Sequence, residues 1–296
     1  MTIIIGTHNE NFHADEVFAI ACFNILMRVF SDDPSCTVIR SRKPEELAKA
    51  DVLVDVGHGK FDHHMKGGAG VRDNGVPYAS FGLVWREHGA EICHGSQEAA
   101  DIVDVQLVQS VDAADCGYSL FDEKVPGVLP YTISQLIASM NPGWQCDDAK
   151  LYDREFERAV GVAEQVLYNE IDRAWGAIEA RDFVRQAIDK VDDPRIIVLH
   201  QFAPWQEVVI TEAPEALYVI YPNANTDGYK LQCVPDAVGS FGKRKALPEE
   251  WAGKKGEELQ QVCGVSDAVF CHPGRFICGA ESLSGAEQMA VLAVKK

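Results

Sequence analysis

The first sixty residues alternate short apolar runs with longer segments that are dense in apolar side chains. Residues 3–5 and 52–56 are apolar runs short enough for buried strands, and residues 38–40 predict another strand between them. Residues 14–30 predict a buried helix, and residues 44–50 a shorter one. Strands and helices that alternate at this spacing are typical of a parallel α/β sheet. Ligands of such sheets bind beyond the carboxyl ends of the strands, which here include the loop after Ile5.

The hydrophobic pattern changes in the second half of the chain. Residues 148–190 are rich in Glu, Arg and Ala, which predicts a long helical connector. Beyond it we expect strands at residues 196–199, 208–211, 217–221, 230–234 and 268–277, and helices at residues 248–264 and 285–294. A chain of 296 residues favours two domains. We therefore predict an α/β protein with an N-terminal domain (1–150), a helical connector (151–191) and a smaller α/β C-terminal domain (192–296).

Composition and charge narrow the class of protein. The amino terminus enters an apolar run without a preceding basic region, and no uncharged run of about 18 apolar residues follows, so we expect a cytoplasmic protein without a membrane span. Nine scattered cysteines without a C-x-x-C pair indicate reduced thiols. The net charge of -18 argues against a broad basic surface that grips long duplex nucleic acid. An anionic substrate must then be bound by metal ions or by a few basic side chains.

Histidines and aspartates gather in two tight clusters before residue 65. The clusters, with one aspartate between them, are His8, His13 and Asp15; Asp55; and Asp62, His63 and His64. Asp55 ends an apolar strand, where an unpaired carboxylate would be costly and a cation would satisfy it. Mixed imidazole and carboxylate ligands suit Mn, Fe, Co or Zn, whereas Mg prefers a nearly all-oxygen shell. A bridging aspartate would hold two ions about 3.5 to 4 Å apart, as in phosphoryl-transfer enzymes.

Simpler interpretations of the same residues stay open at this point. The Asp62, His63, His64 run is also compatible with a solvated turn. Asp112 and Asp115 are compatible with ordinary caps at the start of a helix. The joint pattern nevertheless favours a metal site and hydrolysis of a phosphoester.

Four motifs hold these residues: HNENFHADE from His8, DVLVDVG from Asp51, FDHH from Phe61 and SVDAADCG from Ser110. They resemble the metal-binding motifs of the DHH phosphoesterase superfamily, and more narrowly those of the melanocyte-proliferating-gene-one family, whose members include RNA exonucleases. Further segments match in order, namely MNPGW at Met140, FAPWQE at Phe202, LQCVP at Leu231, LPEEWAG at Leu247 and FCHPGRFICGA at Phe270. The resemblance implies a DHH-phosphoesterase-like parallel-sheet domain joined by helices to a smaller α/β domain.

The resemblance also implies roles for individual residues. One ion would be held by His8, His13 and Asp55, and the second by Asp15, Asp55, His63 and either Asp112 or Asp115. His64 is similar to a histidine that faces the substrate phosphate, and Asp62 would orient His63. His272 and Arg275 of the second domain are candidate anion contacts, although Arg275 is equally compatible with a surface side chain beside a turn.

The function implied is hydrolysis of phosphodiester bonds by a water that two divalent ions activate, with Mn the best match and Mg, Co, Fe or Zn as alternatives. The expected substrate is an RNA end, a short oligonucleotide or a nucleotide. The chain departs from the family at Glu10, where glycine is usual, and at Glu281 and Leu283, where basic residues are common. These departures leave two alternatives open: a phosphatase of a small phosphorylated metabolite or nucleotide, and a metal-binding regulatory protein without enzymatic activity. The oligomeric state is open as well.

Overall fold

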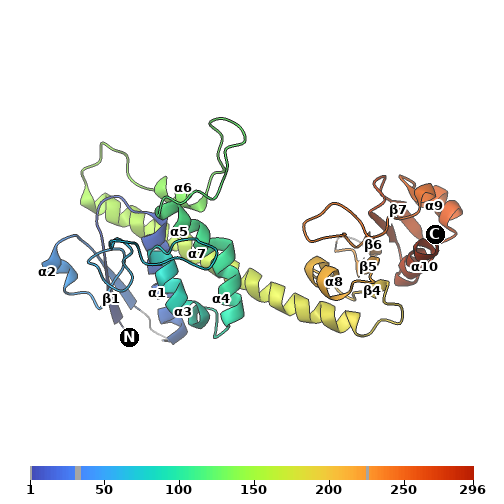
Figure 1. The fold of residues 1–296 in the computed structure, drawn as a ribbon, viewed down its shortest axis with the longest axis horizontal. Helices are drawn as coiled ribbons and strands as arrows, with labels where there is room; N and C mark the ends of the chain where they lie inside the picture. Colours follow the sequence, from blue (N-terminus) through green and yellow to red (C-terminus); the bar gives the residue numbers. More distant parts are fainter. Residues whose placement is uncertain (1, 31–34, 225–226) are drawn as a thin grey trace. The chain divides into compact units, whose positions relative to one another are not determined.

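The chain forms two compact units in the computed structural model, which describes residues 2–30, 35–224 and 227–296 (Figure 1). The first unit comprises Met1–Trp175 and the second Gly176–Lys296. A helix of 40 residues, α7 (Ala149–Ile188), contributes to both. Within the described ranges, no helix is both long and apolar enough to cross a membrane.

A three-stranded parallel sheet organises the first unit. It consists of β1 (Thr2–Thr7), β2 (Ser35–Arg40) and β3 (Val52–Leu53), in the order β2-β1-β3. The parallel arrangement confirms the α/β class expected from the alternation of strands and helices. The third strand is shorter than expected, because the chain leaves the sheet before Asp55. All three strands therefore end near the same edge, where the polar clusters begin.

Helices supply most of the buried side chains of the first unit. They are α1 (Ala14–Phe30), α2 (Pro44–Leu47), α3 (Ser80–Ile92), α4 (Gln97–Val103), a π-helical turn (Asp104–Val108), α5 (Gln109–Asp115), α6 (Ile133–Ala138) and α7. Helix α1 is buried along most of its length, and the ring of Phe18 stacks on Phe81 of α3 with centroids 5.0 Å apart. This packing fixes the start of α1 beside the start of α3, and both starts carry site residues.

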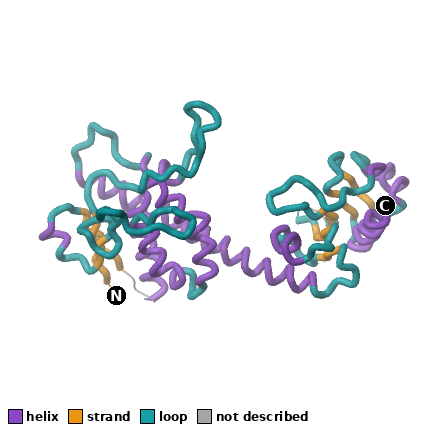
Figure 2. The backbone as a smooth tube through the Cα atoms, viewed as in Figure 1, coloured by secondary structure: helices purple, strands orange, loops and turns teal. Residues whose placement is uncertain are grey.

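A five-stranded mixed sheet forms the second unit (Figure 2). Its strands are β4 (Ile196–Val198), β5 (Tyr218–Pro222), β6 (Tyr229–Cys233), β7 (Ala268–Cys271) and β8 (Ile277–Ala280), in the order β4-β5-β6-β8-β7. Only β4 and β5 pair in parallel. The helices are α8 (Gln206–Glu212), α9 (Gly256–Cys263) and α10 (Leu283–Lys295), with a 3-10 turn at Glu249–Trp251. Alternate residues of β5 enter two separate apolar cores, one on each face of the sheet.

Three sequence expectations for this unit are corrected. Residues 208–211 belong to helix α8 and not to a strand, because Trp205, Val209 and Ala213 recur at helical spacing and pack into one core. The strand expected at residues 268–277 is two antiparallel strands, with a turn in which the Arg275 N–H donates to the His272 carbonyl at 2.8 Å. The helix expected at residues 248–264 is split into the 3-10 turn and α9.

Candidate metal centre

The first cluster is built at the end of β1 and the start of α1. His8 follows the strand directly, and its buried ring places Nε2 3.0 Å from Glu16 Oε1 and 3.3 Å from Asp55 Oδ2. Glu16 also accepts hydrogen bonds from the His13 N–H, at 2.8 and 3.0 Å. Because Glu16 is the third residue of α1, this contact is one half of a capping box. The same carboxylate thus starts the helix and faces the histidine.

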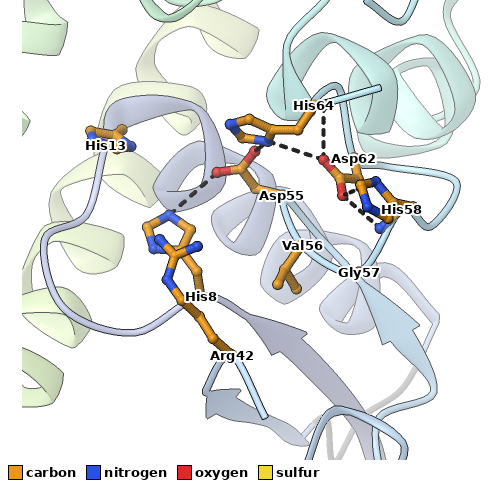
Figure 3. Close-up of a pocket in the computed structure, with 9 residues that line it drawn as sticks. All are labelled: His8, His13, Arg42, Asp55, Val56, Gly57, His58, Asp62 and His64. Carbon is orange, nitrogen blue, oxygen red and sulfur yellow. Dashed lines mark hydrogen bonds and ion pairs between the residues drawn. The ribbon is translucent and has the colours of Figure 1, made fainter. Parts of the chain in front are cut away.

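Asp55 occupies the centre of the site. Its Oδ2 faces His8, and its Oδ1 lies 3.2 Å from His64 Nδ1 (Figure 3). The same Oδ1 lies 3.2 Å from His63 Nε2. Ser80 Oγ, at the start of α3, donates a hydrogen bond to the same Oδ1 at 3.0 Å. The backbone of Asp55 adopts a φ of 56°, a left-handed conformation that Asp tolerates better than most residues. Strained backbone of this kind clusters at functional sites.

A second group of ligands surrounds His63. Its Nε2 lies 3.0 Å from Asp115 Oδ2, 3.2 Å from Asp55 Oδ1 and 3.6 Å from Asp15 Oδ2. Asp15 is fully buried, and its Oδ2 accepts the Ser80 N–H at 3.3 Å. Asp15 Oδ1 has no hydrogen-bond partner among the described residues. A buried oxygen in that state is costly unless another group, such as a cation, satisfies it.

Asp112 and Asp115 have different surroundings although both belong to α5. Asp115 faces His63, whereas Asp112 is fully buried and lies 2.9 Å from Arg72 Nη1. Asp112 Oδ1 also accepts the N–H of Gly82, in the first turn of α3, at 2.9 Å. A Cβ at Gly82 would lie 1.8 Å from Asp112 Oδ2, so glycine is required for this approach. The structure brings Asp115 into the cluster and leaves Asp112 as a structural cap of α3.

Asp62 orients His64 and not His63, which corrects the expectation from the sequence. Asp62 Oδ1 lies 3.0 Å from His64 Nδ1 and accepts the His64 N–H at 2.9 Å, and Oδ2 accepts the His58 N–H at 2.7 Å. The Nδ1 of His63 instead lies 3.8 Å from the thiol of Cys116. Asp62 contacts His64 because its side chain accepts hydrogen bonds from the backbone N–H groups of His58 and His64, in the turn that contains Asp62.

The electrostatics of the cluster favour added positive charge. Burial lowers the pKa of His8, but the carboxylates of Asp55 and Glu16 outweigh burial and raise it to about 10. Burial likewise lowers the pKa of His63, and Asp115 and Asp55 raise it to about 12. Burial and the neighbouring carboxylates raise the pKa of Asp15 well above its usual range. The excess of carboxylates is the situation that a bound divalent cation relieves.

The donor atoms fit metal ions. Three groups have ligand atoms that all lie within 4.8 Å of one another: His8, His13, Glu16 and Asp55; Asp55, His63 and His64; and His13, Asp15 and Asp115. Asp55 and His13 each belong to two of the groups, so neighbouring cations could share them. The imidazole and carboxylate donors suit Mn, Fe, Co or Zn.

Sequence reasoning missed three residues of this site. Glu16 was recognisable from its position three residues after His13, where a capping-box acid is expected. Ser80 gave no sequence signal, because a serine at a helix start is common. Arg42 is exposed and lines a pocket of about 330 Å³ with His8, Asp55 and His64 (Figure 3). Arg42 makes no ion pair with any other described residue.

Other polar residues lie outside the metal-ligand groups. His58 lines the same pocket as Asp55 and His64, but its side chain is 78% exposed and its Nδ1 lies 3.8 Å from Asp62 Oδ2. Glu10 is exposed and adopts a φ of 71°, in the left-handed region that favours glycine. In the second unit, His272 Nδ1 accepts the Gly274 N–H at 2.9 Å, and Arg275 Nη1 reaches the Leu247 carbonyl at 3.4 Å.

Comparison with known proteins identifies the family to which the chain belongs. The profile of the MYG1 exonuclease family, described as "Uncharacterised protein family (UPF0160)", matches residues 4–294. The chain belongs to the MYG1 family. It is 31% identical to the MYG1 exonuclease of Homo sapiens, over 97% of this chain and 84% of the relative. It is also 31% identical to the MYG1 exonuclease of Rattus norvegicus (97% and 83%) and 28% identical to the MYG1 protein of Dictyostelium discoideum (98% and 95%).

Membership of the MYG1 family confirms the family resemblance drawn from the sequence motifs. The match spans both compact units, so the cluster around Asp55 and the residues His272 and Arg275 all lie within the matched range.

Proposed function

We propose that this MYG1-family chain is a divalent-metal-dependent hydrolase of phosphodiester bonds, acting as an exonuclease on RNA ends or short oligonucleotides. One observation carries the proposal: the carboxylate of Asp55 lies between His8 on one side and His63 on the other. A carboxylate with donors on both sides is suited to bridge two cations. The name exonuclease, carried by the human and rat relatives, supports the same class of reaction.

Two ions, with Mn²⁺ as the best match to the donors, would be held on either side of Asp55. His8, His13 and Glu16 would complete one site, and Asp15, His63 and Asp115 the other. When bound, such ions supply an activated water near neutral pH and stabilise charge on the attacking and leaving oxygens. The protein's part is to hold the ligands in place, which Ser80 supports through its bonds to Asp55 and Asp15.

His64 is the residue we assign to the substrate. Its side chain is 59% exposed, and its Nδ1 lies 3.0 Å from Asp62 Oδ1. A neutral imidazole that donates Nδ1–H to Asp62 leaves Nε2 free to face a phosphate, and a protonated one can donate from Nε2. Asp62 therefore acts as the positioning residue for His64.

Arg42 supplies positive charge for the substrate. The guanidinium has no ion-pair partner among the described residues, although it lines the same pocket as His8 and His64. Arginine suits bidentate contacts to a phosphate. We keep His272 and Arg275, both in the second unit, as candidate phosphate contacts.

A phosphatase of small phosphorylated metabolites or nucleotides is the second candidate. It is favoured by the pocket volume of about 330 Å³ beside the cluster, which lies at the lower end of the range for small-molecule sites. Its substrates would be mononucleotides or sugar phosphates and not oligonucleotides.

The test is hydrolysis by the metal-loaded protein of RNAs of two to five nucleotides, a long RNA, and free mononucleotides. We expect release of mononucleotides from the short RNAs in the presence of Mn²⁺, and no turnover by Asp55→Asn. Release of phosphate from mononucleotides alone would favour the phosphatase. Absence of hydrolysis with Mn²⁺, Mg²⁺, Co²⁺ and Zn²⁺ alike would exclude both enzymatic functions and favour a metal-binding protein without enzymatic activity.

A further inference from the structure

A second cavity of the first unit adjoins the candidate metal centre. It has a volume of about 790 Å³ and is lined by residues of α5, α6, the loop that joins them and α7. His13 and Asp115 line this cavity and also belong to the metal-ligand groups. The cavity therefore continues directly from the proposed reaction site, and its volume lies within the range for small-molecule sites. We refer to it as the α5–α6 groove.

Aromatic side chains line the α5–α6 groove without being packed into the protein. The exposed fractions of Tyr118, Phe121 and Tyr131 are 46%, 49% and 69%. None of these rings contacts another aromatic ring within the described part of the chain. Exposed aromatic rings gathered at one site indicate a binding surface. Stacking of a nucleobase on such a ring contributes about 1 to 3 kcal/mol per base.

The polar atoms of the groove also suit a base and not a phosphate. Ser134 Oγ and Glu170 Oε2 line the groove, are buried, and have no hydrogen-bond partner among the described residues. They could donate to or accept from the edge of a base. No lysine or arginine is among the described residues that line the groove. The groove therefore has no positive side chain that would attract a phosphate.

We propose that the α5–α6 groove binds nucleobases of the substrate by stacking on Tyr118, Phe121 and Tyr131, a site that rests on the proposed phosphodiesterase function. A nucleotide whose phosphate lies at the metal cluster has its neighbouring base beside the wall formed by His13 and Asp115. Stacking is tolerant of base identity, so the groove would select nucleic acid over sugar phosphates without selecting a sequence. This gives an acidic protein a way to hold RNA that does not depend on a basic surface.

The proposal is tested by calorimetric binding of a diribonucleotide, ApA, to the Mn²⁺-loaded protein, with a non-hydrolysable methylene phosphonate linkage in the dinucleotide so that no turnover occurs. We expect Phe121→Ala and Tyr131→Ala each to raise the dissociation constant about tenfold. Tyr131→Phe keeps the ring and should bind as wild type. Phe30→Ala is the matched control, because Phe30 is 62% exposed at the far end of α1, about 24 Å along the helix from its start.

The same experiment contains the results that would overturn the proposal. Equal affinity of wild type and both alanine variants, or equal affinity for ApA and its abasic analogue, would remove the base site. A wild-type dimer that Tyr131→Ala dissociates would show that a second copy covers the groove. Hydrolysis of ApA with Mn²⁺ is measured in parallel. Groove-dependent binding without hydrolysis keeps the base site and removes the proposed function, whereas hydrolysis with groove-independent binding does the reverse.

Discussion

Replacing Asp112 and Asp115 with alanine, one at a time, should separate folding stability from metal binding. Both residues belong to α5, but only Asp115 faces His63. Asp112 instead binds Arg72 and the N–H of Gly82. We expect Asp112→Ala to lower the free energy of unfolding and keep the metal affinity of the folded protein. Asp115→Ala should keep stability and lose metal affinity.

The magnitudes follow from the contacts. Asp112→Ala leaves the Gly82 N–H without a hydrogen-bond acceptor, because this group has no partner within its own helix, at a cost of about 1 kcal/mol. It also removes the ion pair between Asp112 and Arg72 Nη1, at about 1 to 3 kcal/mol, although Nη1 keeps its bond to the Pro77 carbonyl and Nη2 its bond to Asp104. The sum is about 3 kcal/mol. For Asp115, loss of a group that merely orients a ligand weakens metal binding by about tenfold or more, and loss of a ligand itself should cost at least that much.

Urea unfolding and Mn²⁺ titration by calorimetry, performed on both variants and on wild type, measure the two quantities. A folded Asp112→Ala protein with weakened Mn²⁺ binding, or an Asp115→Ala protein with unchanged Mn²⁺ binding, would refute the assignment of Asp115 to the metal and Asp112 to the helix cap.

Three further predictions concern single side chains. Glu16→Gln keeps the hydrogen bond to the His13 amide but loses the charge, so Mn²⁺ affinity should fall about tenfold or more with little loss of stability; unchanged affinity in a calorimetric titration would exclude Glu16 as a ligand. His64→Ala should keep its metal content and lose about 100-fold or more in turnover on a short RNA; loss of metal would make His64 a ligand. Burial raises the pKa of Asp112 to about 7, above its value of about 4 in an unfolded chain. The part of the stability that depends on the Asp112 proton is therefore present below pH 4 and lost as pH rises toward 7, whereas the contacts of Asp112 with Gly82 and Arg72 do not require that proton. In urea unfolding, a flat difference between wild type and Asp112→Asn across that window would contradict the shift.

The sequence identified the strands and helices that position the cluster because their signals are local. The apolar run before His8 and the dense apolar segment after His13 match β1 and α1. Residues 208–211 were misassigned for a related reason. Consecutive β-branched residues favour a strand by propensity, but burial of Val209 beside Trp205 and Ala213 selects a helix. The strand propensity of residues 208–211 is therefore outweighed by packing against residues that are brought together only when the chain folds.

The choice between Asp112 and Asp115 could not be made from the sequence. Residues three apart on a helix lie on neighbouring positions of its surface, so both are compatible with the cluster by spacing alone. The position of Arg72, from a distant loop, decides which carboxylate is used structurally. Glu16 was missed although its spacing from His13 predicts a capping-box acid. An acidic residue in the first turn of a helix is common, so nothing in the sequence indicates that this one also contacts His8.

Asp55 is proposed to be shared by two metal sites that perform hydrolysis. The number of Mn²⁺ ions bound per chain, measured together with turnover on a diribonucleotide in wild type and Asp55→Asn, tests this sharing. We expect two ions and measurable turnover in wild type, and loss of turnover with at most one weakly bound ion in the variant. Two ions retained by Asp55→Asn, or turnover that survives the substitution, would contradict the account.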